Sequence, residues 1–160
     1  MASSKDNIWK SFEFLVGAWS GQGGGEPGLG QYERSYRFIF NRKFLEVRNK
    51  STYPPSENNP KGEVHEDIGY FSYDNSRHCH VLRQFHVEGF VNQYRLYQLS
   101  ADGRDIIFIS EAIENISAGW RAMESYHVEN ENEFTETFEL AAPNRPFEVY
   151  SQVTLRRSSR

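Results

Sequence analysis

The chain has 160 residues, one cysteine and a formal net charge of −4, from 18 basic and 22 acidic side chains. The length fits one domain, the single cysteine excludes an internal disulfide, and the acidic balance argues against nucleic acid as a partner. Aromatic residues make up 15% of the chain, which favours sheet over helix. We therefore expect one β-rich domain over residues 1–160, with residues 1–6 as a flexible start.

The cellular compartment is inferred from what the sequence lacks. The opening MASSKDNIWK has no apolar run long enough for a signal peptide, and no segment approaches the roughly 20 apolar residues of a membrane helix. A lone cysteine, Cys79, fits a reducing compartment. We expect a cytoplasmic protein without a membrane partner, and a homodimer is left open.

One helix is expected, near the start of the chain. Trp9, Phe12 and Leu15 recur at close to helical spacing within residues 6–15, and Asp6 is a suitable residue to cap the first turn. This segment would place one apolar face against the rest of the domain.

The remainder of the chain is divided into short strands by turn residues. After a first strand that opens near Gly17, the expected strands are residues 31–40, 43–51, 63–73, 78–87, 92–99, 106–113, 120–128, 133–140 and 147–156. Strands at near-regular spacing with hairpin connections are typical of an antiparallel sandwich or an up-and-down barrel, and a barrel leaves no exposed sheet edge. We predict an all-β, antiparallel up-and-down β-barrel of about ten strands with a short N-terminal helix.

Polar side chains recur on the apolar faces of these strands. Because side chains alternate between the two faces of a strand, we assign the more apolar face of each strand to the interior. On those faces the polar residues are Arg34, Glu66, Arg83, Asn92, Glu111, Glu124 and Glu136. An isolated charge in a dry core costs several kcal/mol, so the set predicts a wet, lined cavity. For any single residue there is an equal alternative: it lies at a strand end and reaches solvent, or the assigned alternation is shifted by one residue and it faces outward.

The polar residues suggest a partly polar site for an amphipathic or anionic small molecule. Two arginines would meet the polar head of the ligand, two carboxylates would orient them, and aromatic side chains would line the apolar part. The predicted ligand-binding residues are Arg34, Tyr36, Phe38, Glu66, Arg83, Phe85, Asn92 and Glu111. A carrier or sensor is the leading hypothesis. A small lyase or isomerase that uses a buried Glu as its base is an alternative, with its catalytic residues unassigned.

Two motifs are assigned structural roles. GGGEPG, at residues 23–28, matches G-x-G-x-x-G, but no helix follows it, so a phosphate-binding loop is excluded and a glycine-rich hairpin loop over residues 21–30 is expected. His78, His80, His86 and Glu88 share strand parity and are of the types that bind zinc. They lie on the more polar face of their strand, so we expect exposed histidines and no metal site.

The beginning and the end of the chain carry a resemblance. Gly17-Ala18-Trp19 resembles the G-x-W signature of calycins, the lipocalin and fatty-acid-binding barrels. That resemblance implies that Gly17 and Trp19 close one end of the barrel, with the Trp under a basic residue of the last strand. Arg156 or its neighbour Arg157 is placed for this role, and Arg156 is the residue we assign.

The fuller stretch FLVGAWSGQGGGEPG, together with the terminal VTLRR, is similar to the nitrobindin-like branch of these barrels. That resemblance implies a ten-stranded barrel and an alternative function, the binding of haem b through a histidine of the last strand with peroxynitrite isomerase activity. The last strand here has no histidine, and the ligand position falls on Tyr150. Tyrosinate can ligate haem iron, so Tyr150 joins the predicted ligand-binding residues.

Overall fold

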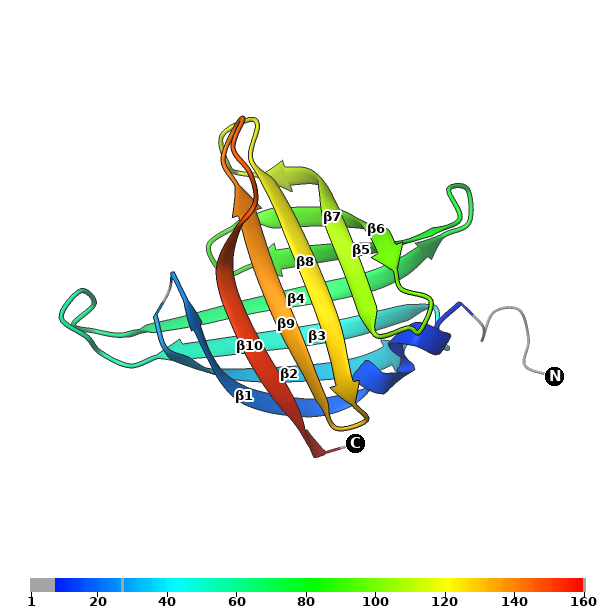
Figure 1. The fold of residues 1–160 in the computed structure, drawn as a ribbon, viewed down its shortest axis with the longest axis horizontal. Helices are drawn as coiled ribbons and strands as arrows, with labels where there is room; N and C mark the ends of the chain where they lie inside the picture. The colour runs from blue at the N-terminus through cyan, green and yellow to red at the C-terminus, as the bar shows by residue number, and fades with distance from the viewer. Residues whose placement is uncertain (1–7, 27, 160) are drawn as a thin grey trace.

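The chain folds into a closed antiparallel β-barrel, which the computed structural model describes for residues 8–26 and 28–159 (Figure 1). Each strand pairs with the next one along the chain, and the last strand closes on the first, as in an up-and-down barrel. The strands are β1 (Gly17–Gly25), β2 (Gly30–Ile39), β3 (Phe44–Tyr53), β4 (Glu63–Asp74), β5 (Cys79–His86), β6 (Val91–Leu99), β7 (Asp105–Glu114), β8 (Arg121–Asn130), β9 (Glu133–Ala141) and β10 (Glu148–Ser159). The predicted fold class is confirmed.

The expected N-terminal helix is a 3₁₀ helix, η1 (Lys10–Leu15), and it is shorter than residues 6–15. Trp9, Phe12 and Leu15 are buried and follow one another at a spacing of three, which matches the three residues per turn of a 3₁₀ helix. The predicted cap Asp6 and the flexible start at residues 1–6 lie outside the described residues. Among the described residues there is no helix that is long and apolar enough to cross a membrane.

The helix covers one end of the barrel, which we call the closed end. Phe12 packs on Phe71 with ring centroids 5.9 Å apart and on Phe108 at 6.1 Å. Trp19 meets Phe134 edge-on at 4.7 Å, and the indole Nε1–H of Trp19 donates a 2.7 Å hydrogen bond to the Leu15 carbonyl. The closed end is therefore a packed aromatic core.

The basic residue over Trp19 is Arg157, so the assignment of Arg156 is wrong. The Arg157 guanidinium lies 4.2 Å from the Trp19 ring and donates hydrogen bonds to the carbonyls of Val16 and Phe14. Arg156 points outward and pairs with Glu133 at 3.0 Å. Neighbouring side chains on a strand face opposite sides, so only one of the two arginines can reach the Trp.

The glycine-rich segment is mostly strand rather than the predicted loop over residues 21–30. β1 runs to Gly25 and β2 begins at Gly30. A Cβ at Gly21 would lie 2.1 Å from the Thr154 carbonyl oxygen, and a Cβ at Gly23 would lie 2.5 Å from the Gln152 carbonyl oxygen. The glycines therefore let β10 approach β1 closely where the barrel closes.

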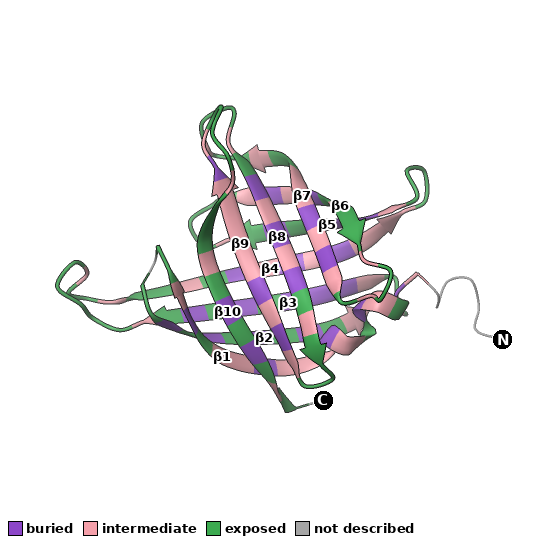
Figure 2. Cartoon of the chain, in the orientation of Figure 1, coloured by how far each residue is buried: buried purple, intermediate pink, exposed green. Residues whose placement is uncertain are grey.

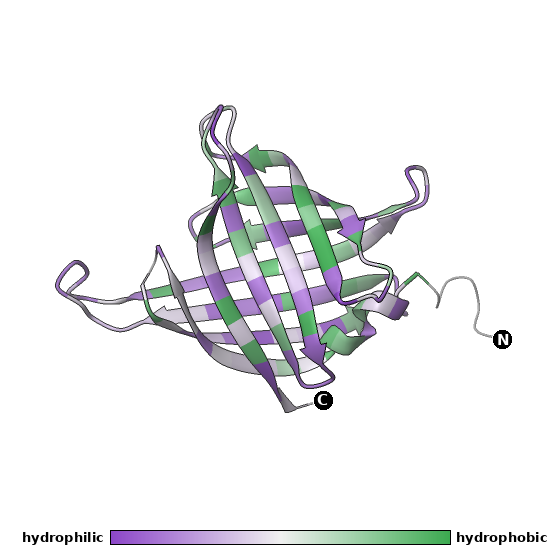
Figure 3. Ribbon diagram, in the orientation of Figure 1, coloured by the Kyte–Doolittle hydropathy of each residue, from purple (hydrophilic) through white to green (hydrophobic). Residues whose placement is uncertain are grey.

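Buried residues recur at alternate positions along the strands (Figure 2). Hydrophilic residues are nevertheless spread along the strands rather than confined to the connections (Figure 3). Several of them are buried, among them Arg34, Asn49, Asp67, Glu124 and Glu136. The interior is therefore apolar only in part, and its polar part is described next.

Candidate ligand-binding pocket

A pocket of about 400 Å³ lies at the end of the barrel opposite η1, which we call the open end. Its lining comes from β2 and from the strands joined by the β3–β4, β5–β6, β7–β8 and β9–β10 connections, which lie at the same end of an up-and-down barrel. The lining residues include Tyr32, Arg34, Asn49, Ser51, Glu63, His65, Asp67, Gln84, His86, Glu88, Phe90, Asn92, Ile113, Glu124, Glu136, Phe138, Leu140 and Tyr150. Polar and apolar side chains both contribute to this lining.

A row of polar residues crosses four neighbouring strands. The strand register pairs Arg34 with Asn49, Asn49 with Asp67, and Asp67 with His86. All four side chains face the interior, and the Asn49 Nδ2–H donates a 2.7 Å hydrogen bond to Asp67 Oδ1. The strand register therefore places these four polar side chains side by side, as a continuous polar wall from β2 to β5.

Arg34 is held in the barrel by Glu136 from the opposite wall. The guanidinium Nε lies 3.1 Å from Glu136 Oε2, and both side chains are more than nine-tenths buried. Burial alone would lower the pKa of Arg34, but the negative charges of Glu136 and Asp67 outweigh it and raise that pKa further. Arg34 is therefore a charged and already paired residue.

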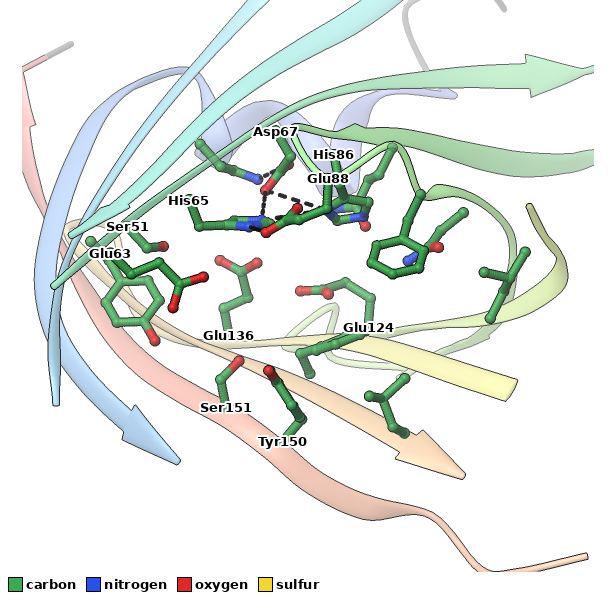
Figure 4. A pocket seen from close by; sticks show the side chains of 18 of the residues that line it. Ser51, Glu63, His65, Asp67, His86, Glu88, Glu124, Glu136, Tyr150 and Ser151 are labelled. Carbon is green, nitrogen blue, oxygen red and sulfur yellow. Dashed lines mark hydrogen bonds and ion pairs between the residues drawn. The ribbon is translucent and has the colours of Figure 1, made fainter. Parts of the chain in front are cut away.

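Glu124 lies beside this pair, on β8. Burial and the neighbouring carboxylate of Glu136 raise the pKa of Glu124 well above its ordinary value, so its neutral form is favoured. Its Oε1 atom is buried and has no hydrogen-bond partner within the described part of the chain. Figure 4 shows the carboxyl groups of Glu124 and Glu136 pointing into the pocket towards the β4–β5 wall.

That wall carries a cluster of two histidines and two carboxylates (Figure 4). His65 Nδ1 lies 2.6 Å from Glu88 Oε1, and His65 Nε2 lies 3.4 Å from Asp67 Oδ2. The contacts with Asp67 and Glu88 raise the pKa of His65 to about 9, whereas burial lowers the pKa of His86. Burial alone would raise the pKa of Asp67, but His65 and Arg34 lower it.

The apolar part of the lining lies on the open-end connections and on the strand ends beside them. It consists of Phe90, Ile113, Ile116, Phe138, Leu140 and the ring of Tyr150. Phe138 and Tyr150 meet edge-on with centroids 5.7 Å apart, near the mouth. A ligand in the pocket therefore meets both apolar side chains and hydrogen-bonding groups.

The predicted inward positions of several site residues are confirmed. Arg34 and Asn92 line the pocket, and Tyr150 lies at its mouth, about one-third exposed. Tyr36 and Phe38 also face inward, but they belong to the packed core of the closed end rather than to the pocket. Whether these residues bind a ligand stays a prediction.

Three predicted site residues are on the outside of the barrel. Glu66, Arg83 and Phe85 are exposed, and Arg83 donates to the Gln93 side chain on the outer surface. The prediction was wrong because β4 and β5 present apolar side chains outward, where Tyr70 meets Phe85. Their inner faces are polar where they line the pocket, so the apolar face was not the interior.

Glu111 is also on the outside, where it pairs with Arg77 at 2.7 Å. The register between β6 and β7 shifts there, since Tyr94 pairs with Ser110 but Gln93 pairs with Ala112. The extra residue reverses the alternation, as a β-bulge does, so that Ile109 faces outward and Ile113 faces the pocket. This bulge left no signal in the sequence.

Sequence reasoning missed His65, Asp67 and Gln84 as inward residues. The signal was present further along the same strands, because Phe71 and Leu82 are fully buried and share parity with them. These strongly apolar residues mark the inner face better than the weaker alternation near the open end. Giving more weight to Phe71 and Leu82 would have assigned the inner faces of β4 and β5 correctly.

The four residues considered together as metal ligands do not meet. His78 lies in an exposed turn, and His80 is buried at the closed end, where its Nε2–H donates a 2.7 Å hydrogen bond to the Ile8 carbonyl. His86 and Glu88 instead join His65, and the three offer ligand atoms within 4.8 Å of one another. The expectation of exposed histidines is therefore wrong for His80 and His86.

The residues at the mouth do not fit a haem held by tyrosinate. Burial, together with nearby Tyr53 and Glu63, raises the pKa of Tyr150, which disfavours the tyrosinate that iron ligation requires. The carboxylates of Glu63 and Glu88 line the same mouth and would face the negatively charged propionates. The residues of the pocket mouth therefore do not fit the haem-binding alternative.

Comparison with known proteins supports the barrel architecture. No protein-family model matches the sequence, and no curated protein matches it. The crystal structure of Rv2717c from M. tuberculosis is similar over 99% of both chains, with 16% identity and a TM-score of 0.65.

Two designed barrels are more distant. A de novo fluorescence-activating β-barrel is 11% identical over 91% of this chain and 95% of its own, with a TM-score of 0.46. A redesigned β-barrel is 11% identical over 91% and 93%, with a TM-score of 0.47. The chain is thus a closed ten-stranded antiparallel β-barrel that shares its fold with a solved natural protein.

Proposed function

We propose that this barrel binds a small amphipathic molecule through its open end, as a carrier or a sensor. The observation that carries the proposal is the pocket of about 400 Å³, which is lined by both apolar and polar side chains. Ligand sites in proteins are commonly cavities of roughly 300–1,000 Å³ with apolar lining and a few placed polar groups. The volume and the mixed lining fit an amphipathic ligand.

The charges in the pocket favour a ligand head that donates hydrogen bonds, such as an amine, amide or hydroxyl group. Arg34 is already paired with Glu136, and the carboxylates of Asp67, Glu63 and Glu88 also line the pocket. A carboxylate or phosphate head would meet these negative groups at close range. Of the two ligand classes expected from the sequence, the pocket therefore supports the amphipathic one over the anionic one.

Kinship with calycins, and with their nitrobindin-like branch, remains part of the proposal. The stack of Arg157 on Trp19 and the whole-length similarity to Rv2717c support it. Haem binding is not proposed, because the mouth does not fit the group. A Soret band on stoichiometric addition of haemin that shifts in Tyr150→Phe would overturn this conclusion.

The proposal can be tested with Nile red, a neutral dye whose fluorescence rises in apolar surroundings. We expect stoichiometric binding that Ile113→Arg abolishes, because this side chain lines the pocket. The matched control is Ile109→Arg on the outer face of the same strand, which should leave binding unchanged. Equal effects of the two substitutions would place the dye outside the pocket and contradict the proposal.

The nature of the ligand head is tested by competition for the same dye. A primary alkylamine should displace Nile red better than the alkanoic acid of equal chain length. Stronger displacement by the acid would contradict the assignment of a donor-bearing head. Native mass spectrometry of protein purified from its source would then identify a co-purifying molecule directly.

A second candidate function, acid–base catalysis, is favoured by one observation. Burial and the neighbouring carboxylate of Glu136 raise the pKa of Glu124, and a buried carboxyl group with a raised pKa is typical of acid–base catalysts. This observation gives the lyase or isomerase alternative a candidate residue, Glu124. A carbon-13 NMR titration of the Glu124 carboxyl should give a pKa well above the ordinary value of a carboxyl group, and an ordinary pKa would remove this candidate.

A further inference from the structure

The histidine–carboxylate cluster in the β4–β5 wall has the spacing of a metal site. Its innermost atoms are His65 Nε2, His86 Nδ1 and Asp67 Oδ2. The two ring nitrogens lie 3.4 Å apart, and the Asp67 oxygen lies 3.4 Å from His65 and 4.0 Å from His86. These three atoms form a compact triangle at the surface of the pocket.

A single zinc ion would match this triangle. Zinc binds histidine nitrogen and carboxylate oxygen at about 2.0–2.2 Å, so the ligand atoms of one tetrahedral ion lie roughly 3.3–3.5 Å apart. Two of the three separations have this value, and the third exceeds it by about half an ångström, which a small rotation of one side chain removes. Two imidazoles and a carboxylate are also a ligand set that zinc commonly takes.

The three donors stand on paired strands rather than on loops. His65 and Asp67 are two residues apart on the inner face of β4, and Asp67 pairs directly with His86 of β5. The strand register therefore sets the separation of the donors. Sites built on such elements hold their geometry better than sites on loops.

Groups around the triangle hold two of the donors in place. Glu88 Oε1 lies 2.6 Å from the other ring nitrogen of His65, which leaves His65 Nε2 directed at the triangle. The Asn49 side chain donates to Asp67 Oδ1, which leaves Oδ2 directed at the same point. Carboxylates and amides behind the ligands are the usual outer partners at zinc sites. The remaining nitrogen of His86, Nε2, is buried without a hydrogen-bond partner within the described residues.

We propose that His65, His86 and Asp67 bind one divalent transition-metal ion, with zinc as the best match, and that Glu88 and Asn49 support the ligands. The fourth coordination position faces the pocket, where a water molecule or a donor atom of the bound small molecule completes the tetrahedron. The ion would bring positive charge to an otherwise carboxylate-rich wall. The inference does not depend on the small-molecule ligand, because all three donors come from the protein.

The first experiment is calorimetric titration of zinc chloride into chelator-treated protein. We expect one ion per chain, with the affinity weakened by at least about 100-fold in His65→Gln and in His86→Gln, because outer partners alone account for 10–100-fold. The matched control is His127→Gln, since His127 forms an exposed 2.6 Å contact with Asp105 away from the pocket. Equal zinc affinity in the site variants and the wild type would overturn the proposal.

A second measurement needs no substitution and therefore does not depend on the folding of a variant. Cobalt(II) in place of zinc should give the intense visible bands of a tetrahedral site. X-ray absorption of the zinc-loaded wild type should show two imidazole ligands at about 2.0–2.1 Å. Weak octahedral cobalt bands, or fewer than two imidazoles, would overturn the proposal. Nile red binding by metal-free protein tests the small-molecule proposal separately. A failure of the zinc proposal can therefore be distinguished from a failure of the small-molecule proposal.

Discussion

The closed and open ends of the barrel are built from the same strands but stabilised differently. On β4, Phe71 and Asp67 face the same interior only four residues apart, and on β9 Phe134 and Glu136 do so only two residues apart. At the closed end the inward side chains pack as aromatic pairs beneath η1. At the open end they pair as charges around a pocket. Stability is thus expected to reside in the closed end and binding in the open end.

The largest expected change in stability comes from removing an aromatic ring from the closed end. Phe108→Ala should lower the free energy of unfolding by about 3–5 kcal/mol, because it leaves a cavity in a fully buried core. Phe138→Ala, on the partly exposed pocket wall, should cost less than half as much. Urea unfolding of both variants measures the difference, and equal losses would show that the two ends are equally packed.

The next effect tests the charged part of the open end. Arg34→Met should destabilise the fold by about 3 kcal/mol, because it leaves the buried carboxylates of Glu136 and Asp67 without their cation. Arg83→Met, exposed on the outer face of β5, should change the stability by less than about 0.5 kcal/mol. Thermal unfolding would contradict the corrected register if Arg83→Met were the more harmful change.

A smaller effect distinguishes the two neighbouring arginines of β10. Arg157→Met should cost about 2 kcal/mol, because it removes the stack on Trp19 and the hydrogen bonds to the carbonyls of Phe14 and Val16. Arg156→Met removes only a surface ion pair and should cost at most about 0.5 kcal/mol. A reversed order in chemical unfolding would restore the assignment of Arg156.

The smallest effect is a pH-dependent one at Glu124. Its folded-state pKa lies above the ordinary value of 4.5, so its contribution to stability is complete below about pH 4.5 and is lost as the pH rises. Gln does not titrate, so Glu124→Gln should gain stability relative to wild type towards pH 8, by about 1.4 kcal/mol per unit of pKa elevation. A stability difference that does not change between pH 4 and pH 8 would show that burial does not raise this pKa.

The open end also shows where the inner face of a strand could not be predicted from the sequence. Assigning the apolar face to the interior worked for β2, where Tyr32 and Tyr36 flank Arg34 on the inner face. It failed on β4 and β5, because a pocket reverses the usual polarity and the outer face carries Ile68 and Phe85 instead. On β7 it failed for Ile109 and Glu111 but held for Ile113, because the extra residue of the bulge exchanges the two faces between them.

The sequence by itself determined the strand spacing, an up-and-down barrel of about ten strands and the presence of charges inside. Each of these depends on local pattern: alternation, turn residues, and the cost of burying a charge in a dry core. The role of Trp19 came from the resemblance of Gly17-Ala18-Trp19 to the G-x-W signature. Only the tertiary structure decided which charges are inside and what they meet. The pairing of Arg34 with Glu136 joins β2 to β9, and the meeting of His65, Asp67 and His86 depends on the register between β4 and β5. Both follow from barrel closure, which brings together residues far apart in the chain.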